Sequence, residues 1–155
     1  MTAVGWLEFA ASAPELAALG AERIERFRFV FVGTIRKDGG PRVNPVEAYF
    51  VDGELVLNMM WRSLKALDLL RDERVYVHTP ILDRLGGPGE FKLRGRACEV
   101  GDPGFREAAA DVIEAAIEWR PPERSHFFAV AAESAAFVTY GEGGKQHVVR
   151  WFAGR

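Results

Sequence analysis

The stretch from Asn58 to Arg71 reads Asn-Met-Met-Trp-Arg-Ser-Leu-Lys-Ala-Leu-Asp-Leu-Leu-Arg, and its pattern predicts the end of a strand followed by a short helix. Ser63 occupies the N-cap position of this helix and Lys65 lies in its first turn. A helix start offers unpaired N–H groups and a partial positive charge, so a hydroxyl and an ammonium there favour a phosphate site. The same residues also fit a plain helix start, in which Ser63 only caps the helix and Lys65 pairs with Asp68 or faces solvent.

The composition is that of an ordinary globular protein. The 155 residues are 48% apolar and 27% charged, which suits one domain over residues 1–155 with a sizeable core. Twenty basic against twenty-two acidic side chains leave a net charge of −2, so no basic field invites nucleic acid. No 18-residue apolar run is present, and we expect neither a nucleic-acid nor a membrane partner.

The cysteine and histidine content disfavours a disulfide framework and a metal site. Cys98 is the single cysteine, which excludes an intramolecular disulfide and fits a reducing compartment. One cysteine and three scattered histidines do not supply a familiar zinc spacing, so we expect no metal. Glu8 and Pro14 interrupt any apolar run near the start, which argues against a signal peptide. We therefore expect a cytoplasmic protein.

The pattern along the chain predicts a mainly β fold with flanking helices. A helical segment over residues 4–26 has a break before Pro14, with Ser12 and Glu15 in a capping pattern. A second long helix begins after Asp102 and ends at Pro121. The strands expected from alternation and turn signals are 27–36, 42–51, 54–60, 74–79, 90–100, 126–132, 135–140 and 146–152. Short connections favour an antiparallel barrel of about six to eight strands with helices packed outside.

Three features of these strands suggest local specialisation. Pro45 lies inside a strand, where it marks an edge or a bulge. Gly95 lies at the centre of another strand and permits a sharp bend or close packing. The first strand is apolar on both faces, with Phe29 and Phe31 on one face and Val30 and Val32 on the other. A lone small barrel would struggle to cover both faces, so we expect a homodimer.

Four ordered segments carry a resemblance to a known family. They are Gly33-Thr34-Ile35-Arg36 leading into 38–46, Ser63-Leu64-Lys65 leading into 66–75, Phe91-Lys92-Leu93-Arg94-Gly95-Arg96-Ala97, and Val148-Val149-Arg150-Trp151. Together they resemble the pyridoxamine 5′-phosphate oxidase-like split-barrel superfamily of flavin-binding proteins. The resemblance implies a split β-barrel homodimer with FMN bound at the interface between the subunits.

The resemblance also implies roles for individual residues. Ser63 and Lys65 would hold the terminal phosphate of the cofactor, and Asn44 falls where the vitamin-B6 oxidases of the family have a phosphate-binding arginine. The residues that would lie beside the isoalloxazine ring and the ribityl chain are Pro45, Val46, Met59 and Met60.

Three departures separate this chain from the vitamin-B6 oxidases. Leu64 replaces the arginine usual between the serine and the lysine, and Asn44 replaces a second arginine. Arg62 or Arg42 could substitute for these cations. The C-terminal Arg-x-Arg arrangement is absent, because the last strand reads Val149-Arg150-Trp151-Phe152. The chain is therefore more similar to divergent branches that bind FMN, the deazaflavin coenzyme F-420 or haem.

Two functional hypotheses follow from the resemblance. The first is an FMN- or F-420-dependent oxidoreductase that transfers hydride with a small-molecule substrate, with no catalytic side chain assigned. The second is a non-catalytic split barrel that has lost its flavin and binds or senses another ligand. A haem-binding relative is a third possibility, in which His78, His126 or His147 would be the candidate axial ligand.

Overall fold

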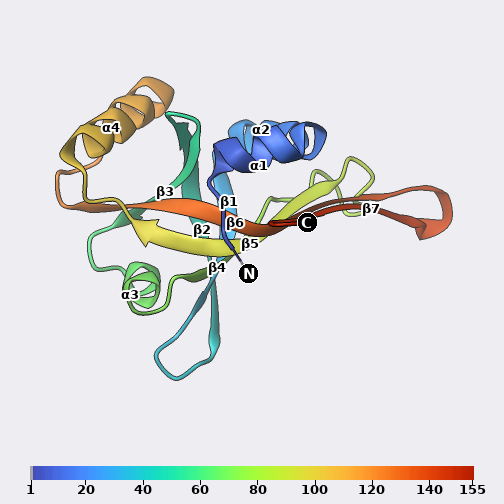
Figure 1. Cartoon of the computed structure of the whole chain (residues 1–155), viewed down its shortest axis with the longest axis horizontal. Coiled ribbons are helices and arrows are strands. Elements are labelled where there is room, and N and C mark those ends of the chain that lie inside the picture. The colour runs from blue at the N-terminus through green and yellow to red at the C-terminus, as the bar shows by residue number, and fades with distance from the viewer. Residues whose placement is uncertain (1) are drawn as a thin grey trace.

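The computed structural model describes residues 2–155 as a barrel with helices packed outside it (Figure 1). The strands are β1 (Phe29–Ile35), β2 (Pro41–Val51), β3 (Glu54–Met60), β4 (Arg74–His78), β5 (Glu90–Glu99), β6 (Ser125–Tyr140) and β7 (Gln146–Phe152). The helices are α1 (Trp6–Ser12), α2 (Pro14–Phe27), α3 (Leu64–Arg71) and α4 (Pro103–Ile117), with a short 3₁₀ turn η1 (Glu142–Gly144). The predicted mainly β, antiparallel split-barrel class is confirmed.

The sheet closes on itself through six strands. Its order is β3-β2-β1-β4-β5-β6-β7, and an additional antiparallel pairing of β3 with β6 joins the two ends of the barrel. The seventh strand, β7, pairs only with the second half of β6, and these two strands form an arm that extends from the barrel at the right of Figure 1. Closure therefore depends on β6, which contributes to both the barrel and the arm.

Local sequence explains the tight connections. In the β1–β2 turn Gly39 has φ +86°, and the Gly40 amide donates to the Asp38 carboxylate at 2.9 Å. Asp52 and Gly53, which join β2 to β3, both have positive φ, as a two-residue hairpin turn requires. Both turns lie where the sequence predicts them.

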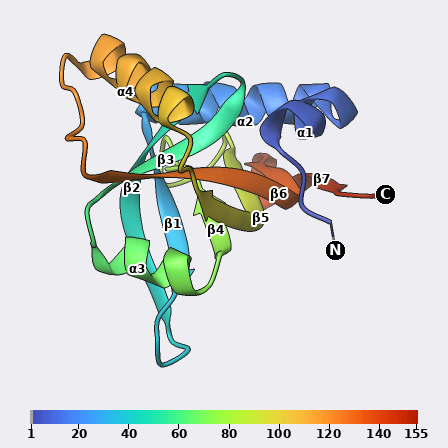
Figure 2. The ribbon, with the colours of Figure 1, turned by 60° about the vertical axis from the view of Figure 1, so that its left-hand side comes forward.

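The core has two parts, one inside the barrel and one beneath α4. Inward-facing residues of the strands pack with the aromatic residues Trp6 and Phe9 of α1 and with aliphatic residues of α2, all of them buried. Outside the barrel, Ile113 of α4 packs against Tyr49, Val51 and Val56 of β2 and β3. Figure 2 shows these three helices at one end of the molecule, while α3 lies beside the β1–β2 hairpin at the other.

Three details differ from the sequence-based expectations. The strands predicted over 126–132 and 135–140 form one continuous strand, because Glu133 is accommodated as an extra residue between the Gly95↔Ala132 and Arg94↔Ser134 pairs. The Ser12 hydroxyl donates to the Phe9 carbonyl instead of capping α2. Helix α2 continues to Phe27, so β1 begins two residues later than predicted.

Candidate functional site

The connection between β3 and α3 is a tight turn, referred to below as the 60–65 turn. The Ser63 amide donates to the Met60 carbonyl at 3.1 Å, and Arg62 between them has φ +53°. A residue other than glycine in this left-handed region costs on the order of 1–3 kcal/mol, so the surrounding structure must hold the turn in place. Its geometry leads the chain directly into the N-terminus of α3.

Ser63 occupies the N-cap position, but its side chain does not cap the helix. Its carbonyl accepts the Leu67 amide at 2.9 Å, whereas its hydroxyl makes no side-chain cap bond. The Ser63 Oγ atom is buried and has no hydrogen-bond partner among residues 2–155. A buried polar atom without a partner is costly. This hydroxyl lies beside the unpaired amides of the first turn of α3, which form an anion-binding environment.

The predicted pairing of Lys65 with Asp68 is wrong, whereas the other alternative, a lysine directed to solvent, agrees with its partial exposure. Within the described part of the chain Lys65 forms no ion pair, and its side chain is partly exposed. Asp68 instead accepts hydrogen bonds from Thr34 Oγ1 at 2.8 Å and Arg42 Nε at 2.7 Å. Lys65 is therefore a cation at the start of α3 that is available to a ligand.

The Asp68 carboxylate ties α3 to the barrel. Arg71 is a third donor, at 3.2 Å, and the aspartate itself is buried. Burial alone would raise the pKa of Asp68, but the hydrogen bonds from Arg42, Thr34 and Arg71 outweigh it and hold this pKa below its usual value. Arg42 is consequently engaged in a structural ion pair, which weakens the suggestion that it substitutes for a missing phosphate cation.

A buried histidine accepts a backbone hydrogen bond from the 60–65 turn. His126, on β6, is only 2% exposed, and its Nε2 atom accepts the Arg62 amide at 3.1 Å. Its Nδ1 atom lies 2.5 Å from Glu99 Oε1. Because an amide can only donate, Nε2 carries the lone pair and Nδ1–H donates to Glu99. The Trp61 ring stacks on the imidazole, with centroids 4.6 Å apart and planes 8° apart.

An apolar surface, referred to below as the outer patch, borders the turn. Strand register places alternate residues of β1, β2 and β4 on the outer face, beside the area that α4 covers. Val43 and Met60 are 65% and 75% exposed, and Phe29 and Phe31 pack edge to face. The patch consists of Phe29, Phe31, Val43, Pro45, Met60 and Tyr76. Exposed apolar side chains that share one face of a sheet are typical of interaction surfaces.

The residues predicted to lie beside the flavin ring are located where the 60–65 turn borders the outer patch. Pairing of β2 with β3 ends at Glu47 and Asn58, so Asn44 and Pro45 lie where β2 has only β1 as a neighbour. Pro45 is thus an edge proline. The side chains of Val46 and Met59 are buried in the barrel core, so they would contact an external ligand only through their backbone.

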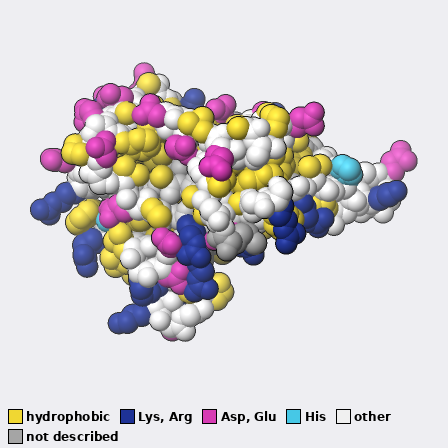
Figure 3. Space-filling model, in the orientation of Figure 1, with side chains coloured by type: hydrophobic (Ala, Val, Ile, Leu, Met, Phe, Trp, Pro, Cys, Tyr) yellow, Lys and Arg dark blue, Asp and Glu magenta, His cyan; other side chains and the backbone are white. Residues whose placement is uncertain are grey.

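Charge on the molecular surface is unevenly distributed. In the orientation of Figure 3, acidic side chains gather along the upper edge, over α4 and the N-terminal helices, whereas most basic side chains lie in the lower half. The 60–65 turn leads into α3, which lies in that lower half (Figure 1).

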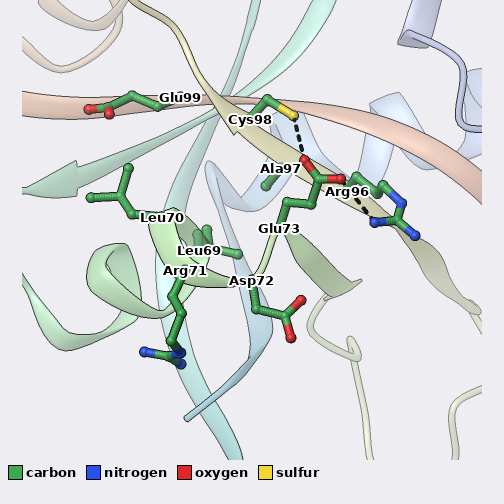
Figure 4. A pocket seen from close by; sticks show the side chains of 9 residues that line it. All are labelled: Leu69, Leu70, Arg71, Asp72, Glu73, Arg96, Ala97, Cys98 and Glu99. Carbon is green, nitrogen blue, oxygen red and sulfur yellow. Dashed lines mark hydrogen bonds and ion pairs between the residues drawn. The ribbon is translucent and has the colours of Figure 1, made fainter. Parts of the chain in front are cut away.

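A separate pocket of about 490 Å³ lies at the other end of α3 (Figure 4). Burial, together with the Glu73 carboxylate that accepts the Cys98 thiol, raises the pKa of Cys98, so the thiol is a poor nucleophile. Among residues 2–155 no group of three acidic, histidine or cysteine side chains could hold a metal ion. The pocket is lined by Leu69, Leu70, Arg71, Asp72, Glu73, Arg96, Ala97, Cys98 and Glu99. Its two arginines are already paired with carboxylates, Arg71 with Asp68 and Arg96 with Glu73 and Glu133.

Sequence reasoning did not identify the support beneath the turn. The sequence suggests His126 only as a haem ligand, because its contact with Glu99 joins residues that lie 27 positions apart. The signal that could have pointed to it is a histidine at the start of a strand, with an acidic residue near the end of the preceding strand. His126 is also a poor candidate for an axial haem ligand, because both ring nitrogens are engaged.

Comparison with known proteins identifies a family. Residues 18–139 match the family model described as pyridoxamine 5′-phosphate oxidase. No curated protein matches this sequence.

Among residues 2–155 no helix has both the length and the apolar character needed to cross a membrane.

Solved structures share the fold at low sequence identity. A Clostridium acetobutylicum protein related to general stress protein 26, of the pyridoxinephosphate oxidase family, has a TM-score of 0.60 at 16% identity, with 83% of this chain and 89% of that chain covered. PhzG from Burkholderia lata, in complex with tetrahydrophenazine-1-carboxylic acid, has a TM-score of 0.63 at 12% identity, covering 94% and 86%. A haem-binding protein from Mycobacterium smegmatis has a TM-score of 0.63 at 18% identity; the match covers 85% of this chain but only 57% of that protein.

Proposed function

Because the chain belongs to the pyridoxamine 5′-phosphate oxidase family, we propose that it binds FMN through the 60–65 turn and transfers hydride to or from a small-molecule substrate. The observation that carries this proposal is the buried Ser63 hydroxyl, which has no partner among residues 2–155 and lies beside the free amides of α3. A phosphate would supply the missing acceptor for this hydroxyl and for the amides.

The side chains around the turn fit a phosphate despite the two missing arginines. Lys65 has no competing ion pair among the described residues, and Arg62 lies in the turn itself. Arg42 is already bound to Asp68. We therefore assign the phosphate to Ser63, Lys65 and the amides of the first turn, with Arg62 as the additional cation.

The outer patch is the proposed surface for the flavin ring and for a second subunit. Asn44 and Pro45 border it where β2 lacks a neighbour, so their backbone would lie beside the ring, with the backbone of Val46 and Met59 and the side chain of Met60 nearby. A homodimer that buries Phe31 and Val43 would cover the patch and enclose the cofactor at the interface. The deazaflavin coenzyme F-420 also carries a phosphate and is the alternative cofactor.

A bound flavin would supply the hydride chemistry itself. This chain would bind the phosphate, orient the ring against the edge of β2 and exclude water through the outer patch. PhzG, which shares the fold, is a protein solved with a small ring compound, and this supports a small-molecule substrate. The lone cysteine fits a cytoplasmic setting.

Replacing Lys65 with alanine is expected to weaken FMN binding by about tenfold, because a charge-assisted contact to the phosphate is lost. Fluorescence quenching of FMN during titration measures this affinity. Riboflavin, which lacks the phosphate, is expected to bind the variant and the original protein equally. Lys145→Ala, which removes an exposed lysine from the β6–β7 arm, is the matched control and should leave both affinities unchanged.

The same titrations distinguish the alternative functions. Absence of binding for both FMN and F-420 by the folded protein would contradict the proposal and favour the non-catalytic binding module. Equal FMN affinity in Lys65→Ala would contradict the assigned phosphate site. A Soret band on addition of haem, without flavin binding, would indicate haem binding, as in the Mycobacterium smegmatis protein.

Introducing a charge into the outer patch is expected to abolish the homodimer. Val43→Asp should shift the sedimentation coefficient from dimer to monomer at micromolar concentration and lower the FMN affinity with it, because a buried unpaired carboxylate is strongly unfavourable. Leu85→Asp, at a similarly exposed leucine in the 81–89 loop, is the control. A monomeric wild-type protein that still binds FMN tightly would rule out the interfacial site.

A further inference from the structure

We infer that His126 is a positioning residue for the phosphate of the cofactor, acting through the backbone of Arg62. This inference rests on the proposed function and extends it to residues outside the 60–65 turn. The imidazole is buried on β6 and contacts the turn from the barrel side. It is therefore placed to control the shape of the turn without touching a ligand.

The turn adopts a conformation that needs external support. Arg62 has φ +53°, in a region that side-chain-bearing residues rarely occupy. Its amide is turned inward to His126 Nε2 at 3.1 Å, and this bond fixes the Trp61–Arg62 peptide, at the residue before Ser63. Loss of this hydrogen bond would allow the turn to relax. The Ser63 hydroxyl and the first amides of α3 would then no longer point toward the same ligand position.

Glu99 determines which histidine nitrogen can accept that bond. Its carboxylate lies 2.5 Å from Nδ1 and keeps the proton there, so the lone pair of Nε2 faces Arg62. Figure 4 shows the Glu99 side chain directed away from the Glu73–Cys98 contact, toward the side of Leu70. Glu99 is partly exposed, whereas the imidazole is buried, so the carboxylate can be altered without disturbing the core.

Two aromatic rings stack on the His126 imidazole and hold its orientation. The Trp61 ring lies parallel to the imidazole at 4.6 Å, and Phe128 stacks on it at 5.8 Å. On β3, the Asn58 side-chain amide donates to the His126 carbonyl at 3.3 Å. The ring is therefore fixed in rotation by two polar contacts and two aromatic neighbours. Among its described contacts, Glu99 is the ionisable group that faces it.

Three variants separate positioning from simple packing. His126→Phe keeps an aromatic ring under Trp61 but cannot accept the Arg62 amide, and it is expected to bind FMN about tenfold more weakly. His126→Gln, which offers an acceptor and a donor, should recover most of the affinity. Riboflavin affinity should change little in either variant, because the positioned group is the phosphate site. His147→Gln, at an exposed histidine on β7, is the matched control.

A flavin-independent readout keeps this inference distinct from the proposed function. In the ligand-free protein, ¹⁵N spectra should show His126 protonated at Nδ1 and unprotonated at Nε2, with the Arg62 amide protected from hydrogen exchange. Glu99→Ala should weaken both signatures, and it serves as the test if His126→Phe does not fold. A protein with these signatures that binds no flavin would contradict the proposed function but not the support of the turn. A proton on Nε2, or equal losses for FMN and riboflavin, would overturn the inference.

Discussion

Replacing Gly95 with alanine is expected to lower the free energy of unfolding by about 3 kcal/mol or more, because the barrel has no space for a side chain there. A Cβ atom at this position would lie 1.9 Å from the carbonyl oxygen of Ala131 and 2.9 Å from its carbonyl carbon. Both contacts are with the backbone of the paired strand β6, which cannot rotate away as a side chain can. Relief would require separation of β5 from β6 at the bulge beside Glu133.

Urea unfolding followed by circular dichroism measures this effect, at one fixed protein concentration because the proposed dimer would make stability concentration-dependent. Gly101→Ala is the control, because in the connection before α4 the added methyl group would have no heavy atom within 4 Å among residues 2–155, apart from its own chain neighbours. This change is expected to alter stability by less than about 0.5 kcal/mol. Equal unfolding midpoints for the two variants would show that β5 and β6 are not packed as described.

Replacing Asp68 with asparagine is expected to cost about 3 kcal/mol at pH 7, because it removes the charge that Arg42 and Arg71 share at a buried position. Asparagine has nearly the same shape, so packing around Thr34 is preserved and the loss reports the ion pairs. The carboxylate joins β1, β2 and α3, and its removal should loosen α3 from the barrel.

The pH dependence follows from the lowered pKa of Asp68. A carboxyl group with a lower pKa in the folded state contributes stability that is fully present above its unfolded pKa of about 3.9. This contribution is lost as the pH falls through the lower folded-state pKa. The stability difference between wild type and Asp68→Asn should therefore be constant from pH 7 to about pH 5 and should narrow below about pH 4.

Asp52→Asn is the matched control for this series. Asp52 is exposed in the β2–β3 turn with φ +49°, a conformation that asparagine also tolerates well. The unfolding free energy of the Asp52→Asn variant should stay close to that of the wild type across the same pH range. If the difference in unfolding free energy between wild type and Asp68→Asn stayed unchanged down to pH 2, the carboxylate would contribute to stability by its shape and not by its charge.

The sequence predicts features of this protein that depend on neighbouring residues. The Asp52-Gly53 turn and the N-cap bond of Asp102 to the Phe105 amide, at 2.8 Å, are both encoded within a few residues. The barrel class follows from strand alternation and short connections. The 60–65 turn could be located because a strand pattern gives way to a helix pattern at Ser63.

Features that depend on distant partners could not be predicted. Ser63 has the usual composition of a cap, and only the folded turn shows that its hydroxyl is left without a described partner. The single strand β6 was predicted as two, because a bulge at Glu133 has the same polar signature as a loop. The Arg42–Asp68 pair spans 26 residues, and no local pattern distinguishes Arg42 from a surface arginine.

The long-range support beneath the 60–65 turn has a consequence for folding kinetics. Arg62 and His126 are 64 residues apart, and because β6 pairs with β3 at His126, we expect them to meet only when that pairing closes the barrel. Contacts of such high sequence separation form late, because the loop entropy must be overcome first. A ligand that recognises the assembled turn would bind only closed chains, so it would slow unfolding without accelerating the earlier steps of folding.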